Sequence, residues 1–509
     1  MFVQFFNFTP NSTNKVCSSQ VFALFFQQSI LYLTITLTLF FVISLLLSNT
    51  LTKGIKFKHL FNFFKNVNIL LLGFIFFFVF LKFIIYLWNY KNYGAALTTG
   101  TFTAVKFNYL YGNPVFNLNG SILSDTIILL AFSSGLVCIH LLGEKNLSKY
   151  TSNINIFSIF LVSTIVMVYT TNLLVMFVGF EMLFIPTLYF VYSHGYVERV
   201  DKTLKILLYW TLSGAFLVLT SLAYLFFKYK TLNFCSLINI KFTFYENVFL
   251  YMAIFFGFGV KVPVFPFHYW LTKIHVEAPA GFSIFLSGFL VKAAIYCFYF
   301  FNLIFDSEFC SQIITVIALF GVVESSIKMW TQTDFKKLIA FATIQEMNLI
   351  LFLLINSQNI LDYSLILFIL IHGWLSTLMF FWVDVIQKKT SSRNIVEVSG
   401  LAYTFPNIKL LTWFIIILFS GFPLTVKFVI EWQILGCLIL NSKAVVILVF
   451  FVIVVIGVVG FAKQLIIILY GIPREPLTIN SNMSKRDKHL FIFITFLLVF
   501  LNLINFLLG

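Results

Sequence analysis

Apolar runs of membrane-spanning length recur along almost the whole chain, from residue 30 to residue 508. Each run is about 20 residues long and is apolar on all sides, which is the pattern of a helix that crosses a lipid bilayer. A membrane β-barrel would instead show alternating strands of about ten residues. The runs therefore predict an all-α polytopic membrane protein.

The composition supports this interpretation and argues against a nucleic-acid partner. Hydrophobic residues make up 60% of the chain and charged residues only 10%, too few to cover the surface of a soluble domain. The formal net charge is +15, but most of the basic residues lie in short loops, where they orient a membrane protein. The six cysteines are scattered without a CxxC pair, so neither a zinc nor an iron–sulfur site is predicted.

The apolar runs divide into about 14 predicted transmembrane helices of about 20 residues each. Their expected positions are 23–48, 69–90, 122–142, 154–171, 172–193, 203–227, 246–267, 278–304, 311–330, 337–356, 361–386, 408–440, 444–470 and 489–508. When successive loops are assigned to alternate sides of the membrane, most loop lysines and arginines fall on one side, as the positive-inside rule expects. Both chain termini are expected on the opposite side.

A pattern of a glutamate followed by helix-interrupting prolines occurs twice in the sequence and predicts two repeats. Glu181 lies in the fifth predicted helix and Glu346 in the tenth, five helices later. Pro263 and Pro266 interrupt the seventh helix, and Pro423 interrupts the twelfth, each roughly the same distance after its glutamate. Because a five-helix unit crosses the membrane an odd number of times, its copy must be inverted. Broken helices at matching positions of two inverted halves point to a transport site.

The two predicted repeats and the segments on either side of them divide the chain into four expected parts. Residues 1–150 would hold helices one to three, and residues 151–305 a first five-helix repeat of helices four to eight. Residues 306–472 would hold the inverted second repeat of helices nine to thirteen, and residues 473–509 a C-terminal transmembrane helix.

Among the charged residues within predicted helices, four candidates stand out: Glu181, Lys261, Lys292 and Glu431. An ionised side chain at mid-membrane costs several kcal/mol unless it is hydrated or paired, so such residues usually face a polar interior. If Glu181 and Lys261 approach, each stabilises the other's charge, and their separation would let the lysine release a proton. The alternative is a static ion pair that pins two helices. Three other lysines are expected to extend to the membrane interface: Lys82, Lys409 and Lys427.

Three histidines are candidates for a proton relay, because an imidazole titrates near neutrality. His275 lies beside the break in the seventh helix, His372 lies in FILIHGWLSTLMF, and His268 is expected at the end of the seventh helix. The alternative for each is a packing residue held by hydrogen bonds. No nucleotide-binding loop, nucleophile triad or catalytic carboxylate pair is detectable in the sequence, so no covalent chemistry is predicted.

These motifs resemble the antiporter-like membrane subunits of respiratory complex I (NADH:ubiquinone oxidoreductase). The resemblance covers about residues 165–435 and rests on FEMLFIPTL (180–188), VKVPVFPFHYWLTKIHVEAP (260–279), LVKAAIY (290–296), QTDFKKLIAF (332–341), IHGWLSTLMF (371–380) and FVIEW (428–432). The HVEAP stretch and Glu431 make the chain most similar to the subunit 4 branch of that family.

The resemblance implies roles for individual residues in proton translocation. Glu181 would pair with Lys261, Lys292 would be the central lysine, and Glu431 the glutamate at the end of the path. Lys205, in LKILLYWTLSGAF, is similar to a basic residue of the family's sixth helix. The chain departs from the family at Glu346, where a histidine is often found, so a relay step through that position is not implied.

The resemblance also implies the surroundings of the chain. NADH, FMN, iron–sulfur clusters and ubiquinone would be bound by other subunits, with quinone reduction elsewhere as the energy source. Expected partners are the antiporter-like subunits 2 and 5 and membrane lipids, with protons as the transported ion. The 69 phenylalanines and the many other residues with AT-rich codons favour an organellar gene, and hence the mitochondrial inner membrane. The alternatives are a subunit of a related cation/proton antiporter or membrane-bound hydrogenase, and a structural membrane-arm subunit without transport.

Overall fold

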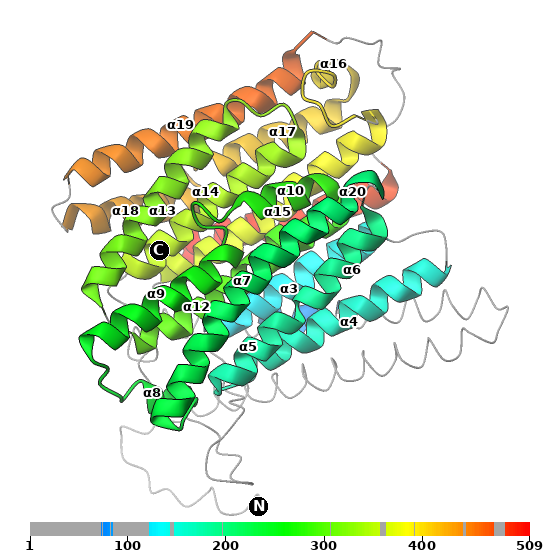
Figure 1. Ribbon diagram of the computed structural model, residues 1–509. Coiled ribbons are helices and arrows are strands. Elements are labelled where there is room, and N and C mark those ends of the chain that lie inside the picture. The colour runs from blue at the N-terminus through cyan, green and yellow to red at the C-terminus, as the bar shows by residue number, and fades with distance from the viewer. Residues whose placement is uncertain are drawn as a thin grey trace, which may run out of the picture.

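The computed structural model describes residues 122–142, 147–195, 197–305, 307–356, 363–390, 392–440, 444–472 and 484–508, with ten further residues within 73–84. The first predicted transmembrane helix and most of the second lie outside these residues. Across the described ranges the regular structure is helical, apart from two isolated β-bridges, and the helices run side by side in a bundle (Figure 1). The chain is an all-α polytopic membrane protein, as predicted.

The first half of the described chain follows the predicted third to eighth helices. Its elements are α3 (Ile122–Leu141), α4 (Leu147–Tyr169), α5 (Leu173–Met182), α6 (Phe184–His194), α7 (Val197–Tyr229), α8 (Phe234–Leu237), α9 (Phe244–Lys261), α10 (Tyr269–Glu277), α11 (Ala280–Phe285), the π-helical segment η2 (Leu286–Leu290) and α12 (Val291–Ile304). The fifth predicted helix is thus a pair, α5 and α6, that meet at Leu183.

The second half follows the predicted ninth to fourteenth helices. Its elements are α13 (Glu308–Met329), α14 (Phe335–Asn356), α15 (Tyr363–Thr390), α16 (Leu401–Thr404), α17 (Pro406–Phe419), α18 (Val426–Leu440), α19 (Ala444–Tyr470) and α20 (Lys485–Leu508). Within the described residues, seven helices are long and apolar enough to cross a membrane, and several shorter apolar helices accompany them.

The seventh predicted helix is broken, but its predicted end at residue 267 was wrong. α9 ends at Lys261, the chain turns through residues 262–268, and a second half-helix, α10, runs from Tyr269 to Glu277. Pro263 and Pro266 lie in this break, where proline cannot supply the hydrogen-bond donor of a continuous helix. α10 was missed because its sequence, YWLTKIHVE, is short and polar for a membrane helix.

The twelfth predicted helix is broken as expected. α17 ends at Phe419 and α18 begins at Val426, with Pro423 between them. The turn contains Gly421, whose φ of 61° is in the left-handed region that favours glycine. The two halves of the chain therefore share the most distinctive feature of the predicted repeat, a helix interrupted in its middle.

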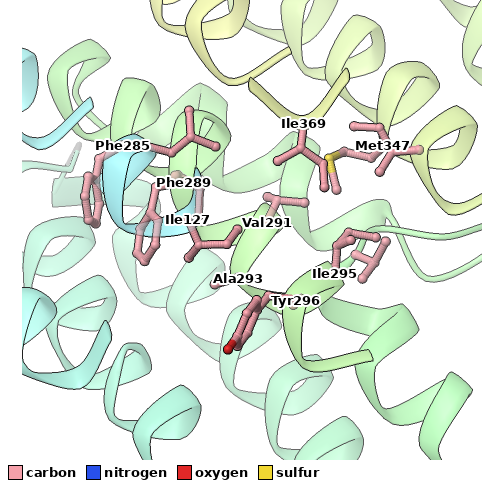
Figure 2. Packing of buried hydrophobic residues seen from close by; sticks show 14 of the residues in the cluster. Ile127, Phe285, Phe289, Val291, Ala293, Ile295, Tyr296, Met347 and Ile369 are labelled. Atoms are coloured by element: carbon pink, nitrogen blue, oxygen red, sulfur yellow. The ribbon is translucent and has the colours of Figure 1, made fainter. Parts of the chain in front are cut away.

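The core lies where the two halves meet. α15 belongs to the second half, yet it contacts α3, α11 and η2 of the first half as well as α17 and α18. Figure 2 shows Ile127 of α3, Phe285, Phe289, Met347 of α14 and Ile369 of α15 among the buried side chains that pack there. This apolar packing surrounds the region of α12, so a polar side chain on that helix is shielded from lipid.

Candidate functional site

Glu181 and Lys261 form an ion pair at the break in the seventh helix. The Lys261 Nζ atom lies 2.7 Å from Glu181 Oε1 and 4.2 Å from the centre of the Phe180 ring. Lys261 is the last residue of α9, where the free carbonyls and the dipole of the helix favour a cation. The two side chains are 11% and 25% exposed, so the pair is only partly shielded.

A cavity of about 50 Å³ lies beside Lys261. Its walls come from both parts of the fifth helix, from α7, from α10 and from the π-helical region of the eighth helix. Two threonines, Thr187 and Thr211, line it together with apolar side chains. Since one water occupies about 30 Å³ in the liquid, the cavity can hold water next to the lysine.

Lys205 is not part of this pair. It is exposed on α7, and it makes no ion pair within the described part of the chain. The structure thus brings Glu181 and Lys261 together, while Lys205 stays at the surface of the same half.

Lys292 is fully buried on α12. Its ammonium donates a hydrogen bond to the carbonyl of Ser287, in the π-helical segment that precedes the helix. A π-helical turn changes the hydrogen-bond register of a helix and is often found at functional sites. Glu346, on α14 of the second half, lies within electrostatic reach of Lys292.

His275 and His372 are also fully buried, on α10 and α15. Neither ring nitrogen of either histidine has a hydrogen-bond partner among the described residues. His275 stacks on Phe380 with 4.6 Å between ring centres and lies within electrostatic reach of Lys292. His372 lies within reach of both Lys292 and Lys427. Both imidazoles thus lie near the central lysine, and ordered water is the usual partner of such buried polar groups.

A second ion pair joins Lys427 of α18 to Glu346 of α14. The Lys427 Nζ atom lies 2.6 Å from Glu346 Oε1, donates a 2.5 Å hydrogen bond to the Phe419 carbonyl, and lies 4.1 Å from the centre of the Phe419 ring. The lysine and glutamate side chains are only 4% and 1% exposed.

The prediction that Lys427 extends to the membrane interface was wrong. A buried carboxylate and an open carbonyl at the end of α17 solvate its ammonium inside the protein, so it need not reach water. The sequence held one signal of this pair. Lys427 follows Glu346 by 81 residues, as Lys261 follows Glu181 by 80.

Glu431 lies one helical turn after Lys427 on α18. Its Oε1 atom is 3.9 Å from the Lys427 Nζ atom, and its side chain is 14% exposed. Gly421 of the break lies against it, because a Cβ at that glycine would be 2.7 Å from Glu431 Oε2. The break, the lysine and the two carboxylates thus form one compact cluster.

His268 lies within the break of the seventh helix, not at the end of that helix as predicted. It is buried, and its Nε2 atom is 3.6 Å from Glu324 Oε2 of α13. The correction follows from α10, which extends the seventh helix beyond this residue.

Two cations of the second half hold the carboxyl end of α10. Lys336 donates to the carbonyl of Ala278 at 2.7 Å, and Arg393 donates to the carbonyl of Val276 at 2.8 Å. Arg393 also pairs with Asp334 at 3.1 Å. Cations at this position satisfy the open carbonyls of a helix end. The sequence suggested only loop charges here, so this link between the halves was missed.

In the part of the chain that the structure describes, no cluster of three or more histidine, cysteine, aspartate or glutamate side chains could hold a metal ion. The buried polar side chains described above are ammonium, carboxylate and imidazole groups, which bind and release protons.

Comparisons with known proteins agree with this architecture. The family model described as "NADH:quinone oxidoreductase/Mrp antiporter, TM" matches residues 170–457, which include both ion pairs. The NADH-ubiquinone oxidoreductase chain 4 of Paramecium tetraurelia is 33% identical over 406 residues, covering 79% of this chain and 84% of the relative. The chain belongs to the NADH-ubiquinone oxidoreductase chain 4 family.

Other members and more distant structures fit the same assignment. The chain 4 protein of Acanthamoeba castellanii is 29% identical over 384 residues, with 74% of this chain and 77% of the relative covered. A chain of the archaeal membrane-bound sulfane sulfur reductase has a TM-score of 0.74 at 17% identity, covering 93% of this chain and 94% of its own length. A chain of the Mrp complex from a Dietzia species has a TM-score of 0.69 at 17% identity, with coverages of 89% and 84%. At this identity the likeness shows the fold.

Proposed function

We propose that this chain moves protons across the mitochondrial inner membrane as a membrane-arm subunit of NADH-ubiquinone oxidoreductase. The observation that carries the proposal is the fully buried Lys292. Its helix, α12, contacts α9, which carries Lys261, and α14, which carries Glu346. A buried lysine costs free energy in a membrane protein unless it is paired or hydrated, and such a residue usually marks an ion or proton path.

The proposed path follows the groups described above. Protons are taken up near Glu181, Lys261 and the surface lysine Lys205, and the cavity beside Lys261 can hold water for this step. His275 passes the protons to Lys292. His372 then carries them from Lys292 towards the second half. They leave near Glu431, whose carboxylate is partly exposed.

The free energy needed to move a proton across the membrane is comparable with the free energy of a buried ion pair. Moving one charge against 100 mV costs about 2.3 kcal/mol. Separating the partners of a buried ion pair costs about 3–5 kcal/mol. Opening or closing the closed Lys427–Glu346 pair therefore involves a free energy comparable with that of moving one proton.

The chain would draw this energy from quinone reduction elsewhere in the complex. NADH, FMN, iron–sulfur clusters and ubiquinone would be bound by other subunits. Its neighbours would be the antiporter-like subunits 2 and 5 and membrane lipids, with both termini on the intermembrane-space side. The broken helices support a division into residues 1–150, two antiporter-like repeats at 151–305 and 306–472, and residues 473–509.

A second candidate function is a subunit of a cation/proton antiporter, which the matching family description, naming an Mrp antiporter beside the oxidoreductase, favours. Sodium dependence separates the two functions. A complex I subunit pumps protons at the same ratio with or without sodium, whereas an antiporter subunit requires the cation.

The test is proton pumping per NADH oxidised in sealed vesicles that contain the complex with Lys261→Met. Assembly is checked first on native gels. The matched control is Lys463→Met, a lysine exposed on α19. We expect Lys261→Met to lose the protons that this chain moves and Lys463→Met to lose none. Unchanged pumping in an assembled Lys261→Met complex would instead favour a structural membrane-arm subunit.

A further inference from the structure

The cluster around Lys427 contains one ammonium and two carboxylates, a different balance from the Glu181–Lys261 pair. We propose that Lys427 moves between Glu346 and Glu431, and that this exchange ties proton uptake by Glu346 to proton release by Glu431. The inference rests on the proposed function and adds a second switch, in the exit half of the path.

The distances allow the exchange without movement of a helix. The Lys427 Nζ atom is 2.6 Å from Glu346 Oε1 and 3.9 Å from Glu431 Oε1. Lys427 and Glu431 are four residues apart on α18, so their side chains share one face of that helix. A rotation about the bonds of the lysine side chain is enough to change partners.

Both carboxylates have room for a proton. Glu346 Oε2 and Glu431 Oε1 are buried and have no hydrogen-bond partner in the described ranges. A protonated carboxyl group gains a donor, whereas an ionised one accepts only. The oxygen of Glu346 that does not face Lys427 is therefore a site where a proton can arrive.

The Phe419 carbonyl holds the lysine during the exchange. It accepts a hydrogen bond from the Lys427 ammonium, and the Phe419 ring lies against the same cation. An ammonium has three donors, so it keeps this bond while one other donor passes from Glu346 to Glu431. The cation never loses all its partners in a site that is nearly closed to solvent.

One lysine balances one ionised carboxylate, so the cluster holds one proton. In the first state Glu346 is ionised and paired with Lys427, and Glu431 is protonated. Glu431 then releases its proton to the exit side, Glu346 takes one from the Lys292 side, and Lys427 moves to Glu431. When the proton passes from Glu346 to Glu431, Lys427 returns, and one proton has crossed the cluster.

The sharpest test reverses the pair in the assembled complex, with Glu346→Lys combined with Lys427→Glu. The reversed pair keeps its attraction, but the cation no longer lies one turn from Glu431 on the same helix. We expect the complex to assemble better than with either single substitution, while pumping per NADH stays as low as with Lys261→Met. Pumping restored to the unmodified ratio would overturn the exchange and leave a static pair.

A second variant keeps the inference testable if the reversed pair does not assemble. Glu346→Gln has nearly the same shape and removes only the charge, so Lys427 would stay on Glu431. We expect the assembled fraction to lose pumping per NADH. Glu246→Gln is the control, because Glu246 pairs with Lys228 at the start of α9, away from the cluster. Normal pumping by assembled Glu346→Gln would refute the exchange.

The two proposals fail in different ways. If Lys261→Met stops pumping but Glu346→Gln does not, the chain translocates protons and only the exchange is wrong. If neither substitution changes pumping, the chain does not translocate protons and both proposals fall.

Discussion

The two halves of the chain build the same kind of ion pair in different surroundings. Lys261 and Glu181 are 2.7 Å apart, and Lys427 and Glu346 are 2.6 Å apart. Each ammonium also lies on a phenylalanine ring, at 4.2 and 4.1 Å. The first pair is partly open, with side chains 11% and 25% exposed, whereas the second is closed at 4% and 1%.

The comparison shows that the two ammonium groups occupy equivalent positions in space, although one lysine precedes its helix break and the other follows it. Lys261 ends the half-helix before its break, while Lys427 follows its break and reaches back to the carbonyl of Phe419. Both cations therefore lie at the carboxyl end of the first half-helix, where the helix dipole favours them. The broken helix supplies the same cation site twice.

The largest expected difference between the pairs is in stability. Glu346→Gln removes the nearer carboxylate from Lys427 in a closed site; breaking a buried pair costs about 3–5 kcal/mol, of which pairing with Glu431 recovers a part. Glu181→Gln leaves Lys261 next to a cavity that admits water, so we expect a cost of about 1 kcal/mol. The measurement is the temperature at which the complex loses its assembled form on native gels. Equal losses in the two variants would show that burial does not distinguish the pairs.

An intermediate effect is expected at the break of the second half. Gly421→Ala places a side chain at a left-handed φ, which costs about 1–2 kcal/mol, and its Cβ would displace the Glu431 carboxylate. We expect lower stability and lower pumping per NADH. Gly436→Ala, on α18 with nothing within 4 Å of the new Cβ, is the control and should be neutral or slightly stabilising. Normal pumping by Gly421→Ala would show that the break in the twelfth helix takes no part in proton exit.

The smallest effect is expected from the two rings. Phe180→Leu and Phe419→Leu keep an apolar side chain but remove the contact between ring and cation, worth about 0.5–2 kcal/mol. We expect the larger loss of thermal stability for Phe419→Leu, because its cation is less exposed. The measurement is the temperature at which each variant complex loses its assembled form when both are heated in parallel. A larger loss for Phe180→Leu would contradict the account of the two environments.

Much of the fold could be predicted because a bilayer imposes length and apolarity on each helix. The predicted ranges of helices three to six and eight to fourteen overlap the described elements, although helices four and six begin six or seven residues earlier than predicted. The second half of the seventh helix escaped because nine residues with a lysine, a histidine and a glutamate do not resemble a membrane helix. The π-helical segment before Lys292 leaves no pattern in the sequence that we can identify.

The site was predicted in one half and only partly in the other. The pairing of Glu181 with Lys261 was expected from the resemblance to the antiporter-like subunits of complex I, and the two side chains do meet. In the second half, Pro423 precedes Lys427, so aligning the repeats on their prolines concealed the equivalent lysine. Aligning them on glutamate and lysine, with separations of 80 and 81 residues, reveals it. The burial that separates a paired lysine from one at the membrane interface required the structure.

Lys292 tests the central claim most directly, because it is fully buried on the helix that contacts both α9 and α14. The measurement is the number of protons pumped per NADH oxidised by sealed vesicles that contain the assembled complex with Lys292→Ala. The account predicts that NADH oxidation continues while the protons moved through this chain are lost. An unchanged ratio in the assembled complex would contradict a proton path through Lys292.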